Sequence, residues 1–542
     1  MPVGAIAGVA FIVGVVFGAL HVPPERRVAD QFARAWQRGD YPAMYGLVSE
    51  KAKARTNLAA FEQSYRDAAL TATTRRVRVG HASGGSGATA SVPVRVSTRI
   101  FGTIRATLRL PFEDSGDGRR VAWRSYLSFP GLSRGESLSR LTRLGPRGAI
   151  LAGDGTPLAS GPDRSSPLAS VPQEVVGTVE SIPAAERDVY RALGYPDDAQ
   201  VGTAGLERIL NAQLAGTPGG ELTAGGRLIA RSTPRPGVAV RSTIDPKLEQ
   251  SALTALGGAV GGVVVMRPQN GEVLAFAGIA LDGLQPPGST FKIITTTAAL
   301  EANKVKLTDS FPVETAAVLS GVSLSNASGE SCGGTFVNSF AQSCNSVFAP
   351  LGVKVGAERL VATAERYGFN ETPSVPGAAE STLPPADQTG DDLAVGSTAI
   401  GQAKVVATPL EMTSIAATIG NGGVRARPTL VRRLRPDAVR VTTLGVASKI
   451  RRLMVQVVKN GTGTKAEIPG VTIAGKTGTA ELGGPPGAND DPQNSDAWFV
   501  SFAPAIRPRV AVGVMLVRAG AGGDYAAPVA RDVLVDALRR VR

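Results

Sequence analysis

Residues 2–20 form an apolar run that contains no charged side chain. As a helix the run would be roughly 28 Å long, enough to cross the hydrocarbon core of a bilayer. A cleaved secretory signal would need a basic flank and a small-residue cleavage site, and neither is evident. Pro23 and Pro24 separate the run from the remainder of the chain, which disfavours a buried globular helix. The sequence therefore predicts an uncleaved membrane anchor over residues 1–24.

The composition of the chain indicates a large folded body rather than a disordered tail. Its 542 residues suggest two to four domains at roughly 100–200 residues each. Hydrophobic residues make up 43% and charged residues 19%, so a sizeable core can form. The net charge of +13 would suit nucleic acid, anionic lipid or acidic wall polymers. Because no nucleic-acid-binding motif and no long Lys/Arg block is evident, no nucleic-acid partner is expected.

Three stretches of different character come after the expected anchor. Residues 25–130 combine helical spacing of apolar side chains with strand-like alternation, which predicts a small α+β domain. Residues 131–245 are richer in Gly and Pro, which favours a linker-type domain of short strands. Residues 246–542 form the last stretch, which is the most strongly patterned from residue 257 on, and Thr243 and Asp245 are the expected caps of its first helix.

The last stretch predicts a sheet with a closing helix. Two apolar runs surround Asn270 and Gly271, which is typical of a β-hairpin. Further strands are expected later in the chain, and an amphipathic helix should end it. These elements are predicted over residues 470–480, 497–504, 510–517 and 526–541.

Histidine is too scarce to act as the base in this stretch. Both histidines, His21 and His81, lie near the amino terminus, which excludes a Ser-His-Asp triad in residues 246–542. Ser289 and Lys292 lie in PPGSTFKIITTTAAL, where a turn leads into an apolar helix. A serine hydroxyl needs an adjacent base, and a buried lysine with a lowered pKa can supply one. An exposed Ser and Lys on a helix surface is the alternative interpretation of this pair.

Two other short segments carry groups that suit the same chemistry. Ser343 offers a hydroxyl that can relay a proton, and Asn345 offers an amide that can position Lys292 or a substrate carbonyl. The alternative is that these residues form a simple helix cap. In KTGTA, Lys476 and Thr477 offer a cation and a hydroxyl for a carboxylate. Gly478 would let a peptide approach the strand closely, whereas an ordinary edge strand is the alternative.

In this order the three segments resemble the S-x-x-K, S-x-N and K-T-G elements of the penicillin-binding protein and serine β-lactamase superfamily. The similarity is to class B, monofunctional transpeptidases and covers roughly residues 140–542. Residues 25–130 resemble the NTF2-like domain of the methicillin-resistance type. Further matches are GLER at 205–208, Asn270-Gly271-Glu272, AIGQAKVVATPLEM at 399–412, KTGTAE at 476–481 and AWFVSFAP at 497–504.

The resemblance implies a multidomain α+β chain with an NTF2-like domain, an elongated β-rich linker or pedestal domain and a transpeptidase domain. The last would have the penicillin-binding/serine β-lactamase-like α/β/α fold with an antiparallel sheet. It would work outside the cytoplasm, although Arg26 and Arg27 oppose the positive-inside rule. The implied function is peptidoglycan D,D-transpeptidation, inhibited by β-lactams. The implied partners are stem peptides ending in D-Ala-D-Ala, the membrane, and glycosyltransferase or division and elongation proteins.

The resemblance also assigns roles to the residues, without cofactor or metal. Ser289 would be the nucleophile and Lys292 its base, helped by Ser343 and Asn345. Lys476, Thr477 and Thr479 would hold the terminal carboxylate, and the amides of Ser289 and Thr479 would form the oxyanion hole. Asp496 stands where the family often has an aromatic residue or His.

Two questions stay open at this level. Cys332 and Cys344 are expected to form a disulfide outside the cytoplasm, with two buried thiols as the alternative. A D,D-carboxypeptidase or β-lactamase-like hydrolase would share every catalytic residue. A non-catalytic cell-wall sensor or division scaffold is the other alternative.

Overall fold

The structure is a computed structural model that describes residues 22–542 apart from 85–87, 117, 169–174, 433–434, 436, 483–493 and 542. The described residues fall into two compact units. The amino-terminal unit comprises Met1–Gly148, Val179–Val201 and Ala212–Val238, and the carboxyl-terminal unit comprises Ala149–Thr178, Gly202–Asn211 and Ala239–Arg542. In the part of the chain that the structure describes, no helix is both long and apolar enough to cross a membrane. Of the anchor predicted over residues 1–24, residues 1–21 lie outside the described part of the chain.

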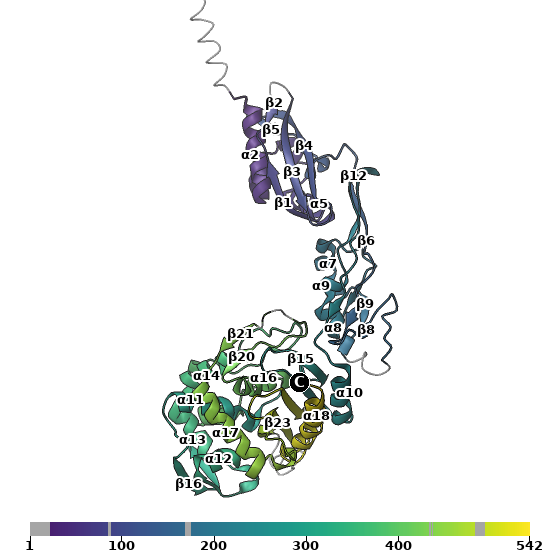
Figure 1. The fold of residues 1–542 in the computed structure, drawn as a ribbon. Coiled ribbons are helices and arrows are strands. Elements are labelled where there is room, and N and C mark those ends of the chain that lie inside the picture. The colour runs from purple at the N-terminus through teal and green to yellow at the C-terminus, as the bar shows by residue number, and fades with distance from the viewer. Residues whose placement is uncertain are drawn as a thin grey trace, which may run out of the picture. The chain divides into compact units, whose positions relative to one another are not determined.

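The amino-terminal unit is built on an antiparallel sheet in the order β1-β3-β4-β5, with β2 beside β3. Side chains alternate along β3, so that Val92, Val94 and Val96 are buried while Arg95 faces outward. The buried face packs against α2 and α5 (Figure 1). The elements are α2 (Pro24–Arg38), α3 (Tyr41–Gly46), α4 (Glu50–Lys53), α5 (Leu58–Thr71), β1 (Thr74–Val79), β2 (Ser83–Gly84), β3 (Thr89–Thr98), β4 (Thr103–Ser115), β5 (Gly118–Val121) and η1 (Ser125–Ser128).

Short strands and helices make up the middle of the chain. One three-stranded sheet has the order β12-β11-β6, another has the order β13-β7-β8, and β9 pairs with β10. The bounds are β6 (Leu138–Arg143), β7 (Ile150–Leu151), β8 (Pro157–Ala159), β9 (Val179–Ser181), η2 (Ala184–Glu186), α7 (Arg187–Leu193), β10 (Gln200–Gly202), α8 (Gly205–Ile209), α9 (Asn211–Leu214), β11 (Gly219–Ala224), β12 (Arg227–Ser232) and β13 (Val240–Arg241).

The main sheet of the carboxyl-terminal unit is antiparallel in the order β15-β14-β24-β23-β22. Alternate residues of β23 enter different clusters: Trp498 faces one core and Phe499 the other. Both faces are therefore covered, and every residue of β14, β23 and β24 is buried. These strands are β14 (Gly261–Met266), β15 (Val273–Gly278), β22 (Ala474–Glu481), β23 (Ser495–Ala503) and β24 (Val510–Leu516).

Helices cover this sheet on both faces. The pair α10 (Pro246–Leu256) and α18 (Ala526–Arg540) packs on one face, and the helices around α11 (Lys292–Glu301) and α16 (Pro409–Gly420) fill the other (Figure 1). The remaining elements are η3 (Gly288–Phe291), β16 (Ser310–Glu314), β17 (Ala316–Leu319), β18 (Val322–Ser325), η4 (Ala327–Gly329), β19 (Cys332–Thr335), α12 (Phe336–Ala341), α13 (Asn345–Val355), α14 (Ala357–Tyr367), η5 (Ala386–Gln388), α15 (Asp392–Ala399), β20 (Val424–Ala426), β21 (Ala438–Arg440), α17 (Leu444–Asn460) and η6 (Thr464–Ala466).

These layers confirm the predicted α/β/α class with an antiparallel sheet, and the hairpin at Asn270-Gly271 joins β14 to β15. One detail of the sequence prediction is wrong. Asp245 caps α10 by accepting hydrogen bonds from the amides of Lys247 and Leu248. Thr243 does not cap this helix, because its hydroxyl donates to the carbonyl of Val273 at 2.5 Å.

Candidate active site

Ser289 lies in the 3₁₀ turn η3, and Lys292 is the first residue of α11 directly behind it. Gly288 has a φ of +51°, and its amide donates to the carbonyl of Gly401 at 2.9 Å. A Cβ at Gly288 would come within 2.6 Å of the carbonyl oxygen of Thr479. The turn can therefore lie against β22 only because residue 288 is glycine. The hydroxyl of the half-buried Ser289 has no hydrogen-bond partner among the described residues.

Lys292 is completely buried beside the second predicted segment. Its Nζ donates to Asn345 Oδ1 at 2.7 Å, to the Ser343 carbonyl at 2.6 Å and to Ser343 Oγ at 3.3 Å. Burial lowers the pKa of Lys292 well below its ordinary value, and the charge of Lys476 lowers it further. A lysine in this environment is suited to accept a proton from a neighbouring hydroxyl.

Ser343 occupies the turn between α12 and α13 in a left-handed conformation, with a φ of +63°. Serine rarely adopts this conformation, and such strain often marks a functional position. The turn directs both the carbonyl and the hydroxyl of Ser343 to Lys292. Lys476 Nζ donates to the same hydroxyl at 2.8 Å. Ser343 Oγ therefore bridges two buried lysines and can pass a proton between them.

A disulfide between Cys332 and Cys344 fixes the residue next to Ser343. Cys332 begins β19, and Cys344 immediately precedes α13. On the other side of the turn, Asn345 Nδ2 donates to the Ser325 carbonyl at 2.7 Å. This bond leaves the amide oxygen of Asn345 facing Lys292, so the orientation of the amide follows from its two partners.

Removing the disulfide should loosen this turn. For the double variant Cys332→Ala, Cys344→Ala we expect the free energy of unfolding to fall by about 3 kcal/mol, because the unfolded chain regains loop entropy. The penicillin acylation rate should fall as well, since Ser343 loses its support. Denaturant unfolding of oxidised wild type and variant measures the first effect, and stopped-flow acylation the second. If the folded variant and the wild type are acylated at equal rates, the disulfide is not needed to hold Ser343 in place.

The third predicted segment lies on β22, at the edge of the main sheet next to η3. Lys476 is completely buried, and its Nζ also donates to the Thr477 carbonyl at 3.0 Å. The Thr477 hydroxyl shares a hydrogen bond of 2.5 Å with Thr462, and Thr479 Oγ1 accepts one of 3.3 Å from the Gly522 amide. The structure thus brings Lys476, Ser343, Lys292 and Asn345 into one connected network beside the turn of Ser289.

Gly478 serves packing in this structure. A Cβ on Gly478 would come within 2.8 Å of the Pro287 carbonyl oxygen and 3.0 Å of Thr290 Cγ2. The space that a side chain would need is therefore filled by the turn that carries Ser289. This reason differs from the close approach of a substrate that the sequence suggested. Glycine at 478 keeps Ser289 close to the strand of Lys476.

The resemblance implies that Lys476 holds a substrate carboxylate, and in that role it should make carboxylate capture depend on pH. Burial lowers its pKa to about 7, so the ammonium predominates below this pH and the neutral amine above it. We expect the second-order rate of acylation by penicillin to fall as the pH rises through about 7. Deprotonation of Lys292 should make the acylation rate rise with pH. For penicillin methyl ester, which lacks the carboxylate, we expect only this rise and no fall above a pH of about 7. Parallel profiles for the two compounds would contradict this role of Lys476.

Several residues that shape the site have no signal in the sequence. Phe348 lies 5.3 Å from Lys292 Nζ and Phe340 lies 5.7 Å from Lys476 Nζ, measured to the ring centroids. Their ring faces favour a nearby cation and exclude water. Thr462 fixes the Thr477 hydroxyl. No short-range pattern marks these residues, since each reaches the site only through packing.

Asp496 is buried and accepts a hydrogen bond from the Arg518 amide at 2.9 Å, and burial raises the pKa of its carboxyl group.

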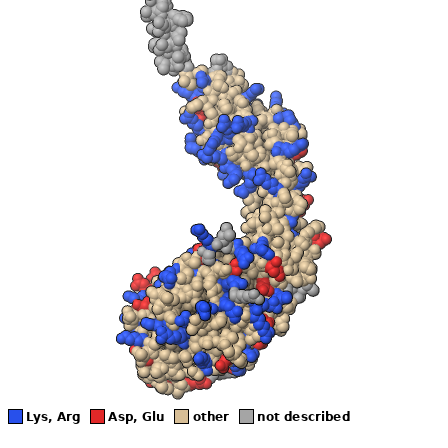
Figure 2. Space-filling model, in the orientation of Figure 1, with Lys and Arg blue, Asp and Glu red and all other residues tan. Residues whose placement is uncertain are grey.

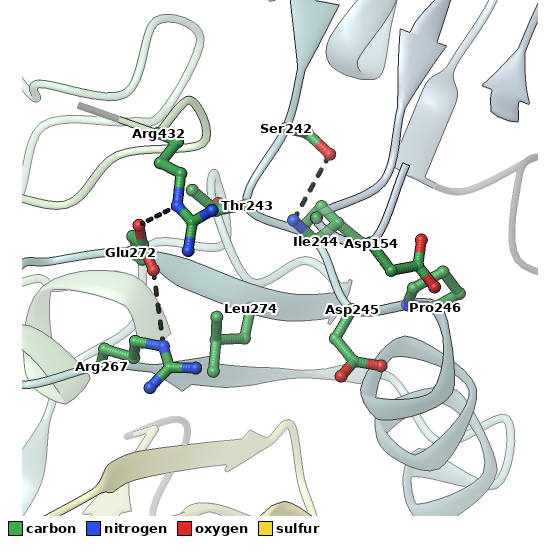
Figure 3. Close-up of a pocket in the computed structure, with 11 residues that line it drawn as sticks. Asp154, Ser242, Thr243, Ile244, Asp245, Pro246, Arg267, Glu272, Leu274 and Arg432 are labelled. Carbon is green, nitrogen blue, oxygen red and sulfur yellow. Dashed lines mark hydrogen bonds and ion pairs between the residues drawn. The ribbon is translucent and has the colours of Figure 1, made fainter. Parts of the chain in front are cut away.

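A separate pocket of about 230 Å³ shares no residue with this network. Its cations are already paired: Arg267 and Arg432 approach opposite oxygens of Glu272 at 3.4 and 3.6 Å (Figure 3). Asp245, on its lining, is occupied as the cap of α10. The candidate active site is therefore assigned from converging side chains and not from cavity size.

The chain matches three family models. Residues 261–535 match the penicillin-binding protein transpeptidase domain. Residues 152–239 match the penicillin-binding protein dimerisation domain. Residues 24–136 match the NTF2-like N-terminal transpeptidase domain.

Curated relatives and solved structures agree with these matches. The chain is 36% identical over 367 residues to the peptidoglycan D,D-transpeptidase PbpA of Mycobacterium tuberculosis, covering 55% of this chain and 72% of PbpA. It is 35% identical over 423 residues to PbpA of Mycolicibacterium smegmatis, covering 65% and 81%. The penicillin G acyl-enzyme of M. tuberculosis penicillin-binding protein A has a TM-score of 0.58 and 30% identity, covering 72% of this chain and 99% of that one.

Proposed function

This chain belongs to the class B penicillin-binding proteins, and from this premise we propose that it is a peptidoglycan D,D-transpeptidase whose acyl-enzyme forms on Ser289. The observation that carries the proposal is the hydroxyl of Ser343, which two completely buried lysines share. One lysine comes three residues after the candidate nucleophile, and the other comes from the strand against which the turn of that nucleophile packs.

The reaction begins with attack of Ser289 Oγ on the carbonyl carbon of the penultimate D-Ala of a stem peptide. Lys292 accepts the hydroxyl proton, and Asn345 holds Lys292 in place. The amide bond to the terminal D-Ala breaks, and the proton reaches the leaving amine through Ser343. Backbone amides of Ser289 and Thr479 stabilise the oxyanion.

Lys476 binds the carboxylate of the terminal D-Ala, with Thr477 and Thr479 beside it. An amine from a neighbouring stem peptide then attacks the ester carbonyl and restores Ser289. A β-lactam carries its carboxylate and its reactive carbonyl in one rigid molecule, so it enters the same path. Opening of its ring forms an ester on Ser289. The amine that is released stays attached to the acyl group and does not leave the site.

The rest of the chain would place this domain at the cell wall. We propose that residues 1–24 form a single membrane anchor, with 25–130 and 131–245 between it and the catalytic domain at 246–542. The catalytic domain would lie outside the cytoplasm, where stem peptides are available. Residues 25–245 would act as a spacer and would dock partner proteins, including a glycosyltransferase or division and elongation proteins. The family match to a dimerisation domain at 152–239 supports such a docking role.

A donor and acceptor assay tests the proposed reaction. The full chain is incubated with a stem pentapeptide ending in D-Ala-D-Ala and a labelled D-amino acid as acceptor amine. We expect incorporation of the label, with release of one D-Ala for each incorporation. Release of D-Ala without incorporation would instead identify a carboxypeptidase. Neither product, together with no covalent adduct from penicillin, would identify a non-catalytic scaffold and overturn the proposal.

A further inference from the structure

The outward face of the sheet in the amino-terminal unit carries a row of arginines. Antiparallel pairing sets Arg78 opposite Arg95 and Arg95 opposite Arg105, across β1, β3 and β4. Arg76 and Arg109 extend the same face along β1 and β4. All five side chains are exposed, and Figure 2 shows Lys and Arg gathered on this unit. We call these five residues the arginine face.

Nothing in the described structure neutralises the arginine face. None of its five side chains forms an ion pair with another described residue. Glu113, further along β4, is already hydrogen-bonded by the Ser49 hydroxyl. Like charges directly opposite each other on neighbouring strands destabilise a sheet. The arginines are therefore unfavourable for the fold, which suggests that they serve an anionic ligand.

The chemistry of the face indicates phosphate. Guanidinium groups bind phosphate oxygens in pairs and lose less hydration than ammonium groups. The five residues span roughly 20 Å along the strands and 10 Å across them, which suits several phosphates at once. The helices α2 and α5 pack on the opposite face of this sheet, so they do not cover the arginines.

Chain order decides between the possible sources of phosphate. The helix α2 starts at Pro24, separated by three residues from the charge-free run of residues 2–20. If that run is the membrane anchor, the lipid headgroups are present at a high effective concentration beside this domain. We propose that the arginine face docks on anionic phospholipid headgroups. This inference rests on the membrane location in the proposed function, and the experiment separates the two.

The test uses the full chain with a thiol at Thr107→Cys, an exposed position between Arg105 and Arg109 on β4. Both native cysteines are in the disulfide, so this thiol is the reactive one. The protein is reconstituted into neutral phosphatidylcholine vesicles or into vesicles with added phosphatidylglycerol. Modification by a water-soluble maleimide is then timed. We expect roughly tenfold slower modification on anionic vesicles, and little slowing in high salt.

Two matched variants locate the effect. Arg78→Glu, Arg95→Glu and Arg105→Glu together should abolish the slowing. The same charge change at Arg34, Arg55 and Arg124, which are exposed elsewhere in the unit, should keep it. Penicillin acylation reports that the carboxyl-terminal unit of each variant is folded, since none of these residues belongs to the serine site, and far-UV circular dichroism with thermal unfolding reports on the amino-terminal unit.

The outcomes distinguish docking from anchoring. Flotation of the vesicles in a density gradient shows whether the chain is bound to them. A chain that floats with neutral vesicles but is modified at equal rates on both vesicle compositions would overturn the docking and support the anchor. A chain that floats only with anionic vesicles, and that loses this with the triple glutamate variant, would support docking without an anchor. Flotation with neither would overturn the docking. Protection by soluble polyphosphate but not by anionic vesicles would also overturn it, and would assign the face to soluble phosphate polymers.

Discussion

Replacing Ser289 by alanine is expected to abolish the covalent adduct that penicillin forms with the full chain. The wild type should gain the mass of one penicillin, whereas Ser289→Ala should gain none. The reason is that the acyl group needs an oxygen nucleophile at this turn, and no histidine-activated serine is available nearby. Because the Ser289 hydroxyl makes no hydrogen bond within the described residues, the free energy of unfolding should change by no more than about 0.5 kcal/mol.

Intact-mass spectrometry measures this effect, and Ser323→Ala provides the matched control. Ser323 is exposed on β18 in the same unit, so its loss should leave the adduct unchanged. An adduct that persists in Ser289→Ala and maps to another residue would place the nucleophile elsewhere. An adduct missing from the wild type would require repetition with a stem-peptide thioester, because a narrow site can exclude a β-lactam and still accept its own substrate.

Replacing Lys292 by methionine is expected to slow acylation by roughly 10²–10⁴-fold, the usual contribution of a positioned general base. Methionine keeps an unbranched side chain in the same buried space but cannot accept a proton. The rising limb of the acylation rate with pH should disappear, since deprotonation of Lys292 produces it. Stopped-flow measurement with a fluorescent penicillin gives both the rate and its pH profile.

Lys354→Met, at an exposed position of α13, is the control for this lysine and should retain the wild-type rate. A loss of less than tenfold in Lys292→Met would mean that a different base serves Ser289. Lys476 would be the candidate, because it shares the Ser343 hydroxyl and burial also lowers its pKa. The Lys292→Met variant would then show a pH profile governed by Lys476 alone.

The spacing of the sequence motifs predicts the candidate active-site residues, but it does not predict their contacts. Ser289 and Lys292 are close in the chain, so helical geometry alone predicts that they meet. The contact of Lys476 with Ser343 joins residues from β22 and from the turn before α13, which only the tertiary fold brings together. The pKa of Lys476 could not be foreseen for the same reason, since its burial depends on packing around the network.

The predicted cap at Thr243 fails because a tertiary contact overrides a local preference. Thr243 has the character of a helix cap, yet its hydroxyl finds the Val273 carbonyl across the sheet. Close approach of a substrate at Gly478 stays a prediction, and the structure adds a packing reason for glycine, since its missing side chain makes room for Pro287 and Thr290. The alternation of Arg76 and Arg78 along β1 is visible in the sequence. Their alignment with Arg95 and Arg105 requires the register of three strands.

The order of the main sheet has a consequence for folding. The hairpin β14–β15 is complete at Gly278, but the strand that pairs with the other edge of β14 begins only at Val510. During synthesis, which starts at the amino terminus, β14 therefore stays unpaired at one edge until nearly the whole sequence is available, and this strand is apolar on both faces. Such long-range pairing folds slowly and exposes an edge that can aggregate. A chaperone that covers residues 261–278 would protect the nascent enzyme during this interval.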